Sequence, residues 1–247
     1  MNDALASLVS LLLSPVALCQ GLAVRRRTVR LAPPRGPQMG RIGDGTPAWR
    51  LLVMGDSSAA GVGAERVSDT LAPQLAQIIH LRTGETVSWR AAGANSAIAS
   101  EIRDHIVPNI EARDFTHIVL TVGTNDMKNY VSKRQFKKGF GSLLYAIHAR
   151  WPQATVIWSP VIDMRDVPAM PYLLGRILRL RTQIINGMGV RLCRERQAIA
   201  ATPLPIRDPS GFAVDGFHAS AAGYRYWAEH LAGFILDERA PPASSLQ

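Results

Sequence analysis

The sequence predicts an α/β fold in which a parallel sheet of about five strands is covered by helices on both faces. From Trp49 onward, apolar runs of strand length alternate with longer amphipathic stretches, which is the pattern of repeated βαβ units. Turns that contain glycine follow the first three apolar runs, where folds of this class collect their reactive groups. A chain of 247 residues can bury one sizeable core, so we expect one domain with an appended segment.

Each element follows from a local pattern. The short apolar runs predict strands at 50–54, 86–90, 116–122, 155–159 and 198–202, of which the last has the weakest pattern. The amphipathic stretches predict helices at 69–82, 97–110, 133–151, 172–195 and 220–237. Gly84 and Pro152 act as stop signals, because glycine favours a left-handed helix cap and proline cannot continue a helix.

An apolar segment precedes this pattern. Residues 4–24 contain no charged side chain and are rich in Leu, Ala and Val, which makes the segment roughly long enough to span a bilayer. A basic cluster follows it directly: Arg25, Arg26, Arg27 and Arg30. We interpret residues 1–24 as a membrane anchor, with a solvated basic tail after it as the alternative.

The location of the protein is inferred from the same segment. A cleaved secretory peptide fits less well, because the first residues carry Asp3 and no Lys or Arg. The arginines after the segment favour a cytoplasmic position for the rest of the chain, and a secreted or periplasmic location is the alternative. Cys19 lies in the apolar segment and Cys193 in the body, so the folded part cannot form an internal disulfide.

The domain organisation follows from composition. Residues 25–48 are basic and rich in Pro and Gly, which predicts a linker without a core. The folded domain is expected to occupy residues 49–240, and residues 241–247 form a short tail.

The net charge of +9 is concentrated near the N-terminus. Residues 1–50 hold seven arginines and two aspartates, a local charge of +5, whereas the other 197 residues hold 21 basic and 17 acidic side chains, a charge of +4. Nucleic-acid-binding proteins more often spread basic residues along a groove with interleaved aromatic side chains. The distribution therefore argues against nucleic acid as a partner.

Ser57 is the candidate nucleophile. The turn Gly55-Asp56-Ser57-Ser58 follows the apolar run 51–54, which would bring the serine hydroxyl to the edge of the sheet. A serine hydroxyl is a weak nucleophile unless a base removes its proton, so the hypothesis requires a histidine oriented by a carboxylate. Asp215 and His218 provide both, because a carboxylate three positions before a histidine can reach its ring across one tight turn.

Two further turns with glycine follow the next strands, Ala92-Gly93-Ala94-Asn95 and Gly123-Thr124-Asn125-Asp126. Glycine lets backbone N–H groups approach a ligand closely, and an oxyanion formed during acyl transfer needs two or three such donors aimed at one point. The side-chain amide of Asn125 can add a neutral donor. These turns are therefore candidates for an oxyanion hole.

Each motif has another interpretation when it stands alone. Gly-Asp-Ser is common in loops, the turn at 123–126 could begin a helix, and Asp215 could cap the helix expected from Ser220. The combination is more specific, because the serine, the glycine turn, the Asn-Asp turn and the D-x-x-H pair occur together and in this order. With all four blocks present, residues 49–236 resemble the SGNH (GDSL-type) hydrolase family.

The resemblance implies a flavodoxin-like, three-layer α/β/α sandwich. It implies that Ser57 is the nucleophile, that His218 is the general base and that Asp215 orients the histidine. It also implies an oxyanion hole formed by the backbone N–H groups of Ser57 and Gly93 and by the Asn125 side chain. The sharp G-x-S-x-G turn of other serine hydrolases is absent here, as it is from this family.

Other polar patterns are assigned structural roles. Asp56 and Asp126 are expected to brace loops, because an acid beside Ser57 cannot easily orient a histidine that must itself contact that serine. No H-E-x-x-H, C-x-x-C or clustered carboxylate set predicts a metal site, and no Gly-Lys-Ser/Thr predicts a phosphate-binding loop. The expected chemistry needs no metal and no cofactor.

We therefore interpret the protein as a serine esterase for carboxylic esters of short or medium acyl chain, with a small-molecule, lipid or glycan ester as substrate. The segments expected to shape the pocket, 128–140 and 163–174, do not identify that substrate. Five side chains could line an acyl pocket or, as burial statistics favour, belong to the core: Met164, Val167, Met170, Tyr172 and Leu173. The alternative function is a membrane-anchored, noncatalytic protein that binds a lipid or glycan. Nothing in the sequence indicates an oligomeric state.

Overall fold

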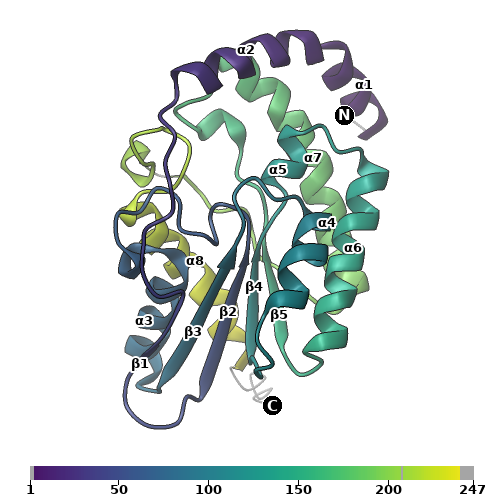
Figure 1. The fold of residues 1–247 in the computed structure, drawn as a ribbon. Coiled ribbons are helices and arrows are strands. Elements are labelled where there is room, and N and C mark those ends of the chain that lie inside the picture. The colour runs from purple at the N-terminus through teal and green to yellow at the C-terminus, as the bar shows by residue number, and fades with distance from the viewer. Residues whose placement is uncertain (1–2, 207, 240–247) are drawn as a thin grey trace, which may run out of the picture.

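The computed structural model describes residues 3–206 and 208–239, and it confirms the three-layer α/β class (Figure 1). The sheet has six strands in the order β1-β3-β2-β4-β5-β6, and all neighbours are parallel except β1 and β3. The strands are β1 (Met39–Ile42), β2 (Trp49–Gly55), β3 (Val87–Gly93), β4 (His117–Thr121), β5 (Thr155–Ser159) and β6 (Ile199–Ala200). The expected tail at 241–247 lies outside the described residues.

Helices cover both faces of the sheet. They are α1 (Asp3–Leu12), α2 (Ser14–Arg27), α3 (Leu71–Thr83), α4 (Ala99–Glu101), α5 (Thr124–Lys128), α6 (Lys133–Arg150), α7 (Tyr172–Glu195) and α8 (Ala221–Arg239). Short turns are η1 (Val67–Asp69), η2 (Ile102–Ile106), η3 (Val107–Asn109), η4 (Met164–Asp166) and η5 (Pro209–Gly211). Helices α3 and α8 pack on one face, and α4, α6 and α7 pack on the other (Figure 1).

Successive residues of the central strands enter different cores. Leu51 and Val53 of β2 pack with α3 and α8, whereas Leu52 and Met54 pack with α6 and α7, and all four side chains are fully buried. Burial of each such side chain contributes about 1.5–3 kcal/mol. Because both faces of β2 are covered, the strand is a continuous apolar run, which is why its sequence predicts it.

The segment 25–48 differs from the expected linker. Its first residues complete α2, and Met39–Ile42 forms β1, which pairs antiparallel with β3 at the edge of the sheet. Residues of β1 alternate between exposed and half-buried, so no apolar run marks the strand in the sequence. The sheet is therefore mixed and six-stranded rather than parallel and about five-stranded.

Two other elements differ from their expected form. The helix expected at 97–110 is divided into α4, the π-helical turn η2 and the 3₁₀ turn η3. Pro108 in η3 has no N–H to donate, so a regular α-helix cannot continue through it. The strand expected at 198–202 has only two residues in its ladder with β5.

The apolar segment 4–24 forms two helices rather than one. Pro15 lies in the first turn of α2, and the axes of the two helices differ by 60°. Within residues 3–206 and 208–239, no single helix is long and apolar enough to cross a membrane, and one bent pair, Leu5–Leu12 with Ser14–Arg27, meets the criteria of length and composition together. Both helices contact α7, at the end of the sheet where the parallel strands finish (Figure 1).

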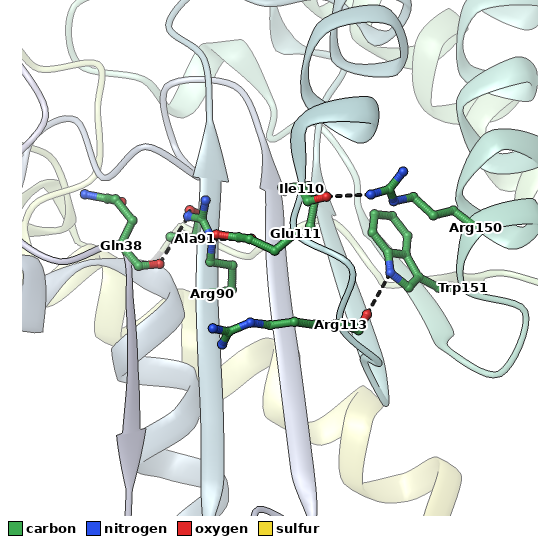
Figure 2. A network of polar contacts seen from close by, with 8 residues as sticks. All are labelled: Gln38, Arg90, Ala91, Ile110, Glu111, Arg113, Arg150 and Trp151. Carbon is green, nitrogen blue, oxygen red and sulfur yellow. Dashed lines mark hydrogen bonds and ion pairs between the residues drawn. The ribbon is translucent and has the colours of Figure 1, made fainter.

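A polar network holds the connection from η3 to β4 in place (Figure 2). The Arg90 guanidinium on β3 donates to the Glu111 carboxylate at 3.1 Å and to the Gln38 carbonyl at 3.4 Å. From α6 and the residue after it, Arg150 donates to the Ile110 carbonyl at 2.5 Å and Trp151 donates to the Arg113 carbonyl at 3.0 Å. Such partly exposed contacts contribute less than about 1 kcal/mol each, so their main effect is to position the chain that enters β4.

The packing of α7 on β5 generates the first prediction. Trp158 is fully buried, and a Cβ at Gly189 would lie 2.1 Å from its ring, whereas a Cβ at Gly187, two residues earlier on α7, would meet no atom within 4 Å. We expect Gly189→Ala to lower the free energy of unfolding by about 1–3 kcal/mol through overpacking. We expect the control Gly187→Ala to raise it by up to about 1 kcal/mol, because alanine has the higher helix propensity. Urea unfolding measures both, and equal effects of the two variants would contradict this packing.

A second prediction concerns Asp126. Burial raises the pKa of its carboxyl from 3.8 to about 6, against a hydrogen bond from the Ala99 N–H at 3.2 Å. Because the pKa of Asp126 is higher in the folded state, binding of a proton to this carboxyl stabilises the fold. This stabilisation is complete below the pKa of Asp126 in the unfolded chain, and it is lost as the pH rises through the pKa of Asp126 in the folded protein.

The unfolding free energy of the wild type, measured relative to Asp126→Asn, should therefore fall by about 2 kcal/mol between about pH 4 and pH 7. Urea unfolding of both proteins across this range tests the expectation, with Asp114→Asn as a control at an exposed site. A difference between wild type and Asp126→Asn that does not vary with pH would refute it.

Candidate active site

Ser57 lies in the turn directly after β2, at the carboxyl end of the sheet. The Asp56 N–H donates to the Thr121 carbonyl of β4 at 3.0 Å, so hydrogen bonds between β2 and β4 continue up to the residue before Ser57. The carbonyls of Asp56 and Ser57 then accept from the N–H groups of Ala60 and Val62, at 3.1 and 3.0 Å. Ser57 is 8% exposed, so the surrounding residues hold it in a defined place.

Asp215 and His218 lie in the loop before α8. The Ala213 N–H donates to the His218 carbonyl at 2.7 Å, and Gly216, with a φ of 65°, donates to the Ala213 carbonyl at 2.8 Å. The Asp215 carboxylate accepts the backbone N–H groups of Phe217 and His218 at 2.9 and 3.0 Å. This tight turn holds the carboxylate beside the histidine ring.

Ser57, His218 and Asp215 form one chain of hydrogen bonds. His218 Nε2 lies 3.2 Å from Ser57 Oγ, and His218 Nδ1 lies 2.5 Å from Asp215 Oδ2. The tautomer with a proton on Nδ1 donates to the carboxylate and leaves Nε2 to accept from the serine hydroxyl. The structure thus brings together the three residues that the sequence predicts, although 161 positions separate Ser57 from His218.

The environment of Asp215 keeps it ionised. Burial alone would raise the pKa of this carboxyl, but the hydrogen bonds from the His218 ring and from the N–H groups of Phe217 and His218 outweigh burial and lower it. An ionised carboxylate can stabilise positive charge on the imidazole ring.

Gly93 and Asn125 approach the Ser57 turn from two sides. Gly93 ends β3, and a Cβ there would lie 2.1 Å from the Ala60 nitrogen, so only glycine lets the strand end against this turn. Asn125 is buried, lines the same cavities as Ser57 and His218, and donates one amide N–H to the Ala97 carbonyl at 3.0 Å. The same nitrogen also donates a longer hydrogen bond, of 3.5 Å, to Asp56 Oδ2.

Asp56 connects these turns. It accepts the Ser58 N–H at 3.0 Å and lies 3.5 Å from the side-chain nitrogen of Asn125. Burial raises the pKa of the Asp56 carboxyl, while the Ser58 hydrogen bond and the Lys128 charge oppose the rise. These contacts agree with the bracing role that the sequence suggests for this residue.

Lys128 is a charged residue of the site for which the sequence predicts no individual role, although it begins the segment 128–140 that is expected to shape the pocket. Its Nζ lies 4.8 Å from the centre of the Phe217 ring, beside His218. Burial lowers the pKa of this ammonium, and the charge of Asp56 opposes the change. Its position three residues after Asn125 would place both on one helix face, but α5 has only five residues and shows no apolar periodicity to reveal it.

Two cavities meet at Ser57 and His218. The smaller one has a volume of about 280 Å³ and is lined mostly by apolar residues of the loops after β5 and before α8 and of α8 itself. They include Val161, Ile162, Met164, Val167, Leu204, Phe212 and Trp227. The larger one, of about 920 Å³, lies under α2 and contains Lys128, Met170 and Leu174. Of the five candidates for an acyl pocket, Met164 and Val167 thus line the small cavity, Met170 lines the large one, and Tyr172 and Leu173 are exposed.

The side chains that commonly ligate metals do not cluster in the part of the chain that the structure describes. Among the residues that the structure describes, no group of three His, Cys, Asp or Glu side chains could hold a metal ion. Two histidines away from the site contact backbone carbonyls instead: His80 meets Glu85 at 2.8 Å and His230 meets Thr202 at 2.9 Å.

Solved structures with the same fold include several esterases. The lipase/acylhydrolase from Enterococcus faecalis is 18% identical, with 78% of this chain and 98% of that chain covered and a TM-score of 0.59. TesA is 16% identical, with 75% and 97% covered and a TM-score of 0.60. The family 3 carbohydrate esterase of Clostridium thermocellum is 15% identical, with 77% and 96% covered and a TM-score of 0.61. A comparison with curated proteins gave no significant match.

The family is shown by the sequence itself. The profile of the GDSL-like lipase/acylhydrolase family matches residues 53–226, more than half of the chain. The matched region begins within β2 and ends within α8, so it includes Ser57, Asn125 and His218. The chain therefore belongs to the GDSL-like lipase/acylhydrolase family.

Proposed function

We propose that the protein hydrolyses carboxylic esters, with Ser57 as nucleophile, His218 as general base and Asp215 as the carboxylate that orients the histidine. The observation that carries the proposal is the hydrogen-bond chain with distances of 3.2 Å from Ser57 Oγ to His218 Nε2 and 2.5 Å from His218 Nδ1 to Asp215 Oδ2. A serine hydroxyl within reach of a histidine that is held by a buried carboxylate is the arrangement that activates serine.

The reaction proceeds in two acyl-transfer steps. His218 Nε2 takes the hydroxyl proton while Ser57 Oγ attacks the ester carbonyl, and the tetrahedral intermediate then expels the alcohol, which takes the proton from His218. A water molecule, deprotonated by the same nitrogen, attacks the acyl-serine, and the second tetrahedral intermediate releases the acid and expels Ser57 Oγ, which takes the proton back from His218. Asp215 stays ionised throughout and stabilises the imidazolium.

Asn125 and two backbone N–H groups are proposed to stabilise the oxyanion. The Asn125 side chain lines both cavities beside Ser57, and of its two hydrogen bonds the one to Asp56 is long, at 3.5 Å, so this N–H can turn to a nearby oxyanion. The N–H groups of Ser57 and Gly93 complete the set, because the Gly93 backbone packs directly on the Ser57 turn. Fixed donors aimed at the developing charge lower the barrier without reorganisation.

The cavities support a substrate with a short or medium acyl chain. The volume of about 280 Å³ is at the small end of ligand pockets, and its apolar lining suits an aliphatic chain. The larger cavity, of about 920 Å³, can hold the alcohol part of the ester. Its lining, which combines apolar residues with Asn95 and the basic side chains of Arg25, Arg30 and Lys128, favours a lipid-like alcohol with a polar or anionic group over a purely polar glycan.

The first test is the Ser57→Ala variant. We expect hydrolysis of a short-chain aryl ester to fall at least about 10⁴-fold in kcat/KM, since the nucleophile is lost, and labelling by a fluorophosphonate probe to disappear. The neighbouring Ser58→Ala variant is the control and should keep both. An unlabelled wild-type protein without esterase activity would instead favour the alternative, a noncatalytic lipid- or glycan-binding protein.

The second test concerns the oxyanion hole. We expect Asn125→Ala to lower kcat on the same ester on the order of 10²-fold with little change in KM, because the donor acts mainly in the transition state. Asn129→Ala, at an exposed position of the same segment, is the matched control. Thermal unfolding of both variants checks the loss of the Ala97 contact. An Asn125→Ala protein with wild-type kcat would exclude this donor.

A further inference from the structure

The helix pair α1 and α2 packs on the domain through small side chains. Among residues 5–27, whose burial the structure describes, Ala6, Ser10 and Ala17 are buried, and both helices contact α7. The Ser10 hydroxyl is satisfied within its own helix by the Ser7 carbonyl at 2.9 Å. The face of the helix pair that carries these buried residues therefore packs against the protein and does not need lipid to cover it.

The outer face of the pair is apolar and exposed. Leu5, Leu8, Leu11 and Leu12 of α1 are between 49% and 70% exposed, and Leu18 and Leu22 of α2 are 64% and 45% exposed. Isolated exposed leucines are ordinary, but six of them lie within 18 residues here, and concentrations of exposed apolar residues mark interaction sites. Leaving these leucine side chains in contact with water is unfavourable in free energy.

Basic side chains adjoin this apolar surface. Arg25, Arg26 and Arg27 form the last turn of α2, and Arg30 follows. Among the described residues, none of the four has an ion-pair partner, and the sequence has no acidic residue between 4 and 43. An apolar helix face next to unpaired arginines complements the surface of an anionic bilayer, where acyl chains meet negative headgroups.

The same helix forms a wall of the active-site cavity. Ala17, Gly21 and Val24 of α2 line the cavity of about 920 Å³ that contains Ser57 and His218. Leu18 and Leu22 belong both to this lining and to the exposed apolar surface, so the cavity reaches the outer face along α2.

From these contacts we infer that α1 and α2 lie on the surface of an anionic lipid bilayer and that the ester reaches Ser57 from the bilayer through the cavity under α2. The inference rests on the proposed function and extends it to a substrate class: a membrane-soluble ester whose short or medium acyl group enters the small cavity and whose larger, lipid-like alcohol part occupies the large one. The pair lies on the membrane rather than across it, because a span would expose the buried residues Ala6, Ser10 and Ala17 and separate both helices from α7.

The experiment uses the full-length protein and vesicles of phosphatidylcholine with or without roughly 30 mol% phosphatidylglycerol. Binding is measured by co-sedimentation. Turnover is measured with a water-soluble short-chain aryl ester and with an octanoate ester of an alkylated fluorescent alcohol that partitions into the vesicles. The wild type should bind the anionic vesicles, bind neutral ones more weakly, and lose binding in roughly 0.5 M salt.

The apolar surface is tested by Leu8→Ser, Leu11→Ser and Leu12→Ser combined, since none of the three lines the cavity. Vesicle binding and turnover of the vesicle ester should both fall on the order of tenfold or more, while turnover of the soluble ester stays within about twofold. The control combines Leu81→Ser and Val190→Ser, two exposed apolar residues elsewhere, and should change neither.

The basic cluster is tested by Arg26→Gln with Arg27→Gln, against Lys137→Gln with Lys138→Gln on α6 as the control. The arginine variant should lose the preference for anionic vesicles, and the lysine variant should keep it.

A wild type that does not bind vesicles, or a leucine variant that binds and hydrolyses the vesicle ester like the wild type, would overturn the inference. Self-association through α1 and α2 without vesicle binding, seen by light scattering, would assign the surface to a second copy of the chain and overturn it equally. A protein that binds vesicles but hydrolyses neither ester would refute the proposed function and the delivery of substrate, and leave the membrane contact standing.

Discussion

The common end point of β2, β3 and β4 is the constraint on which the site depends. Gly55 pairs with Gly93 on one side and with Thr121 on the other, so the three strands finish at the same level. The Ser57 turn and the two turns that carry Gly93 and Asn125 all begin there. A slip of one residue would exchange the residues of β2 between the two cores. The apolar packing that selects the register therefore also places the serine.

The parts of the fold that sequence predicts well are those with local signals. Strands 51–54 and 155–159 are buried on both faces and so must be continuous apolar runs, and the D-x-x-H spacing of Asp215 and His218 needs only one turn. The strand β1 has no such signal, because it is half-exposed and its pairing with β3 is distant in sequence. Lys128 was equally hidden, since its place beside Phe217 depends on a loop 89 positions away.

Hydropathy alone could not separate a spanning helix from a helix pair that packs on a domain. Both need a long apolar stretch, and a window average gives the same weight to an alanine against α7 and to a leucine in solvent. The distinction lies in the face of each helix that carries the small residues: Ala6 and Ser10 are four residues apart and so share one face of α1, and Ala17 lies on the buried face of α2. That face becomes informative only when α7 is seen beside it.

The carboxylates next to the motif residues act on the site through the backbone. Asp56 holds the Ser58 N–H and lies beside Asn125, Asn125 donates to the turn after β3, and Asp126 accepts the N–H of Ala99. The three turns are thereby bonded to one another. Burial raises the pKa of both carboxyls, which shows that desolvation works against these contacts and that the hydrogen bonds and surrounding cores must offset it. A loss of activity in an Asp56 or Asp126 variant would accordingly report a displaced serine or asparagine, and would not make either acid a member of the chain from Ser57 through His218 to Asp215.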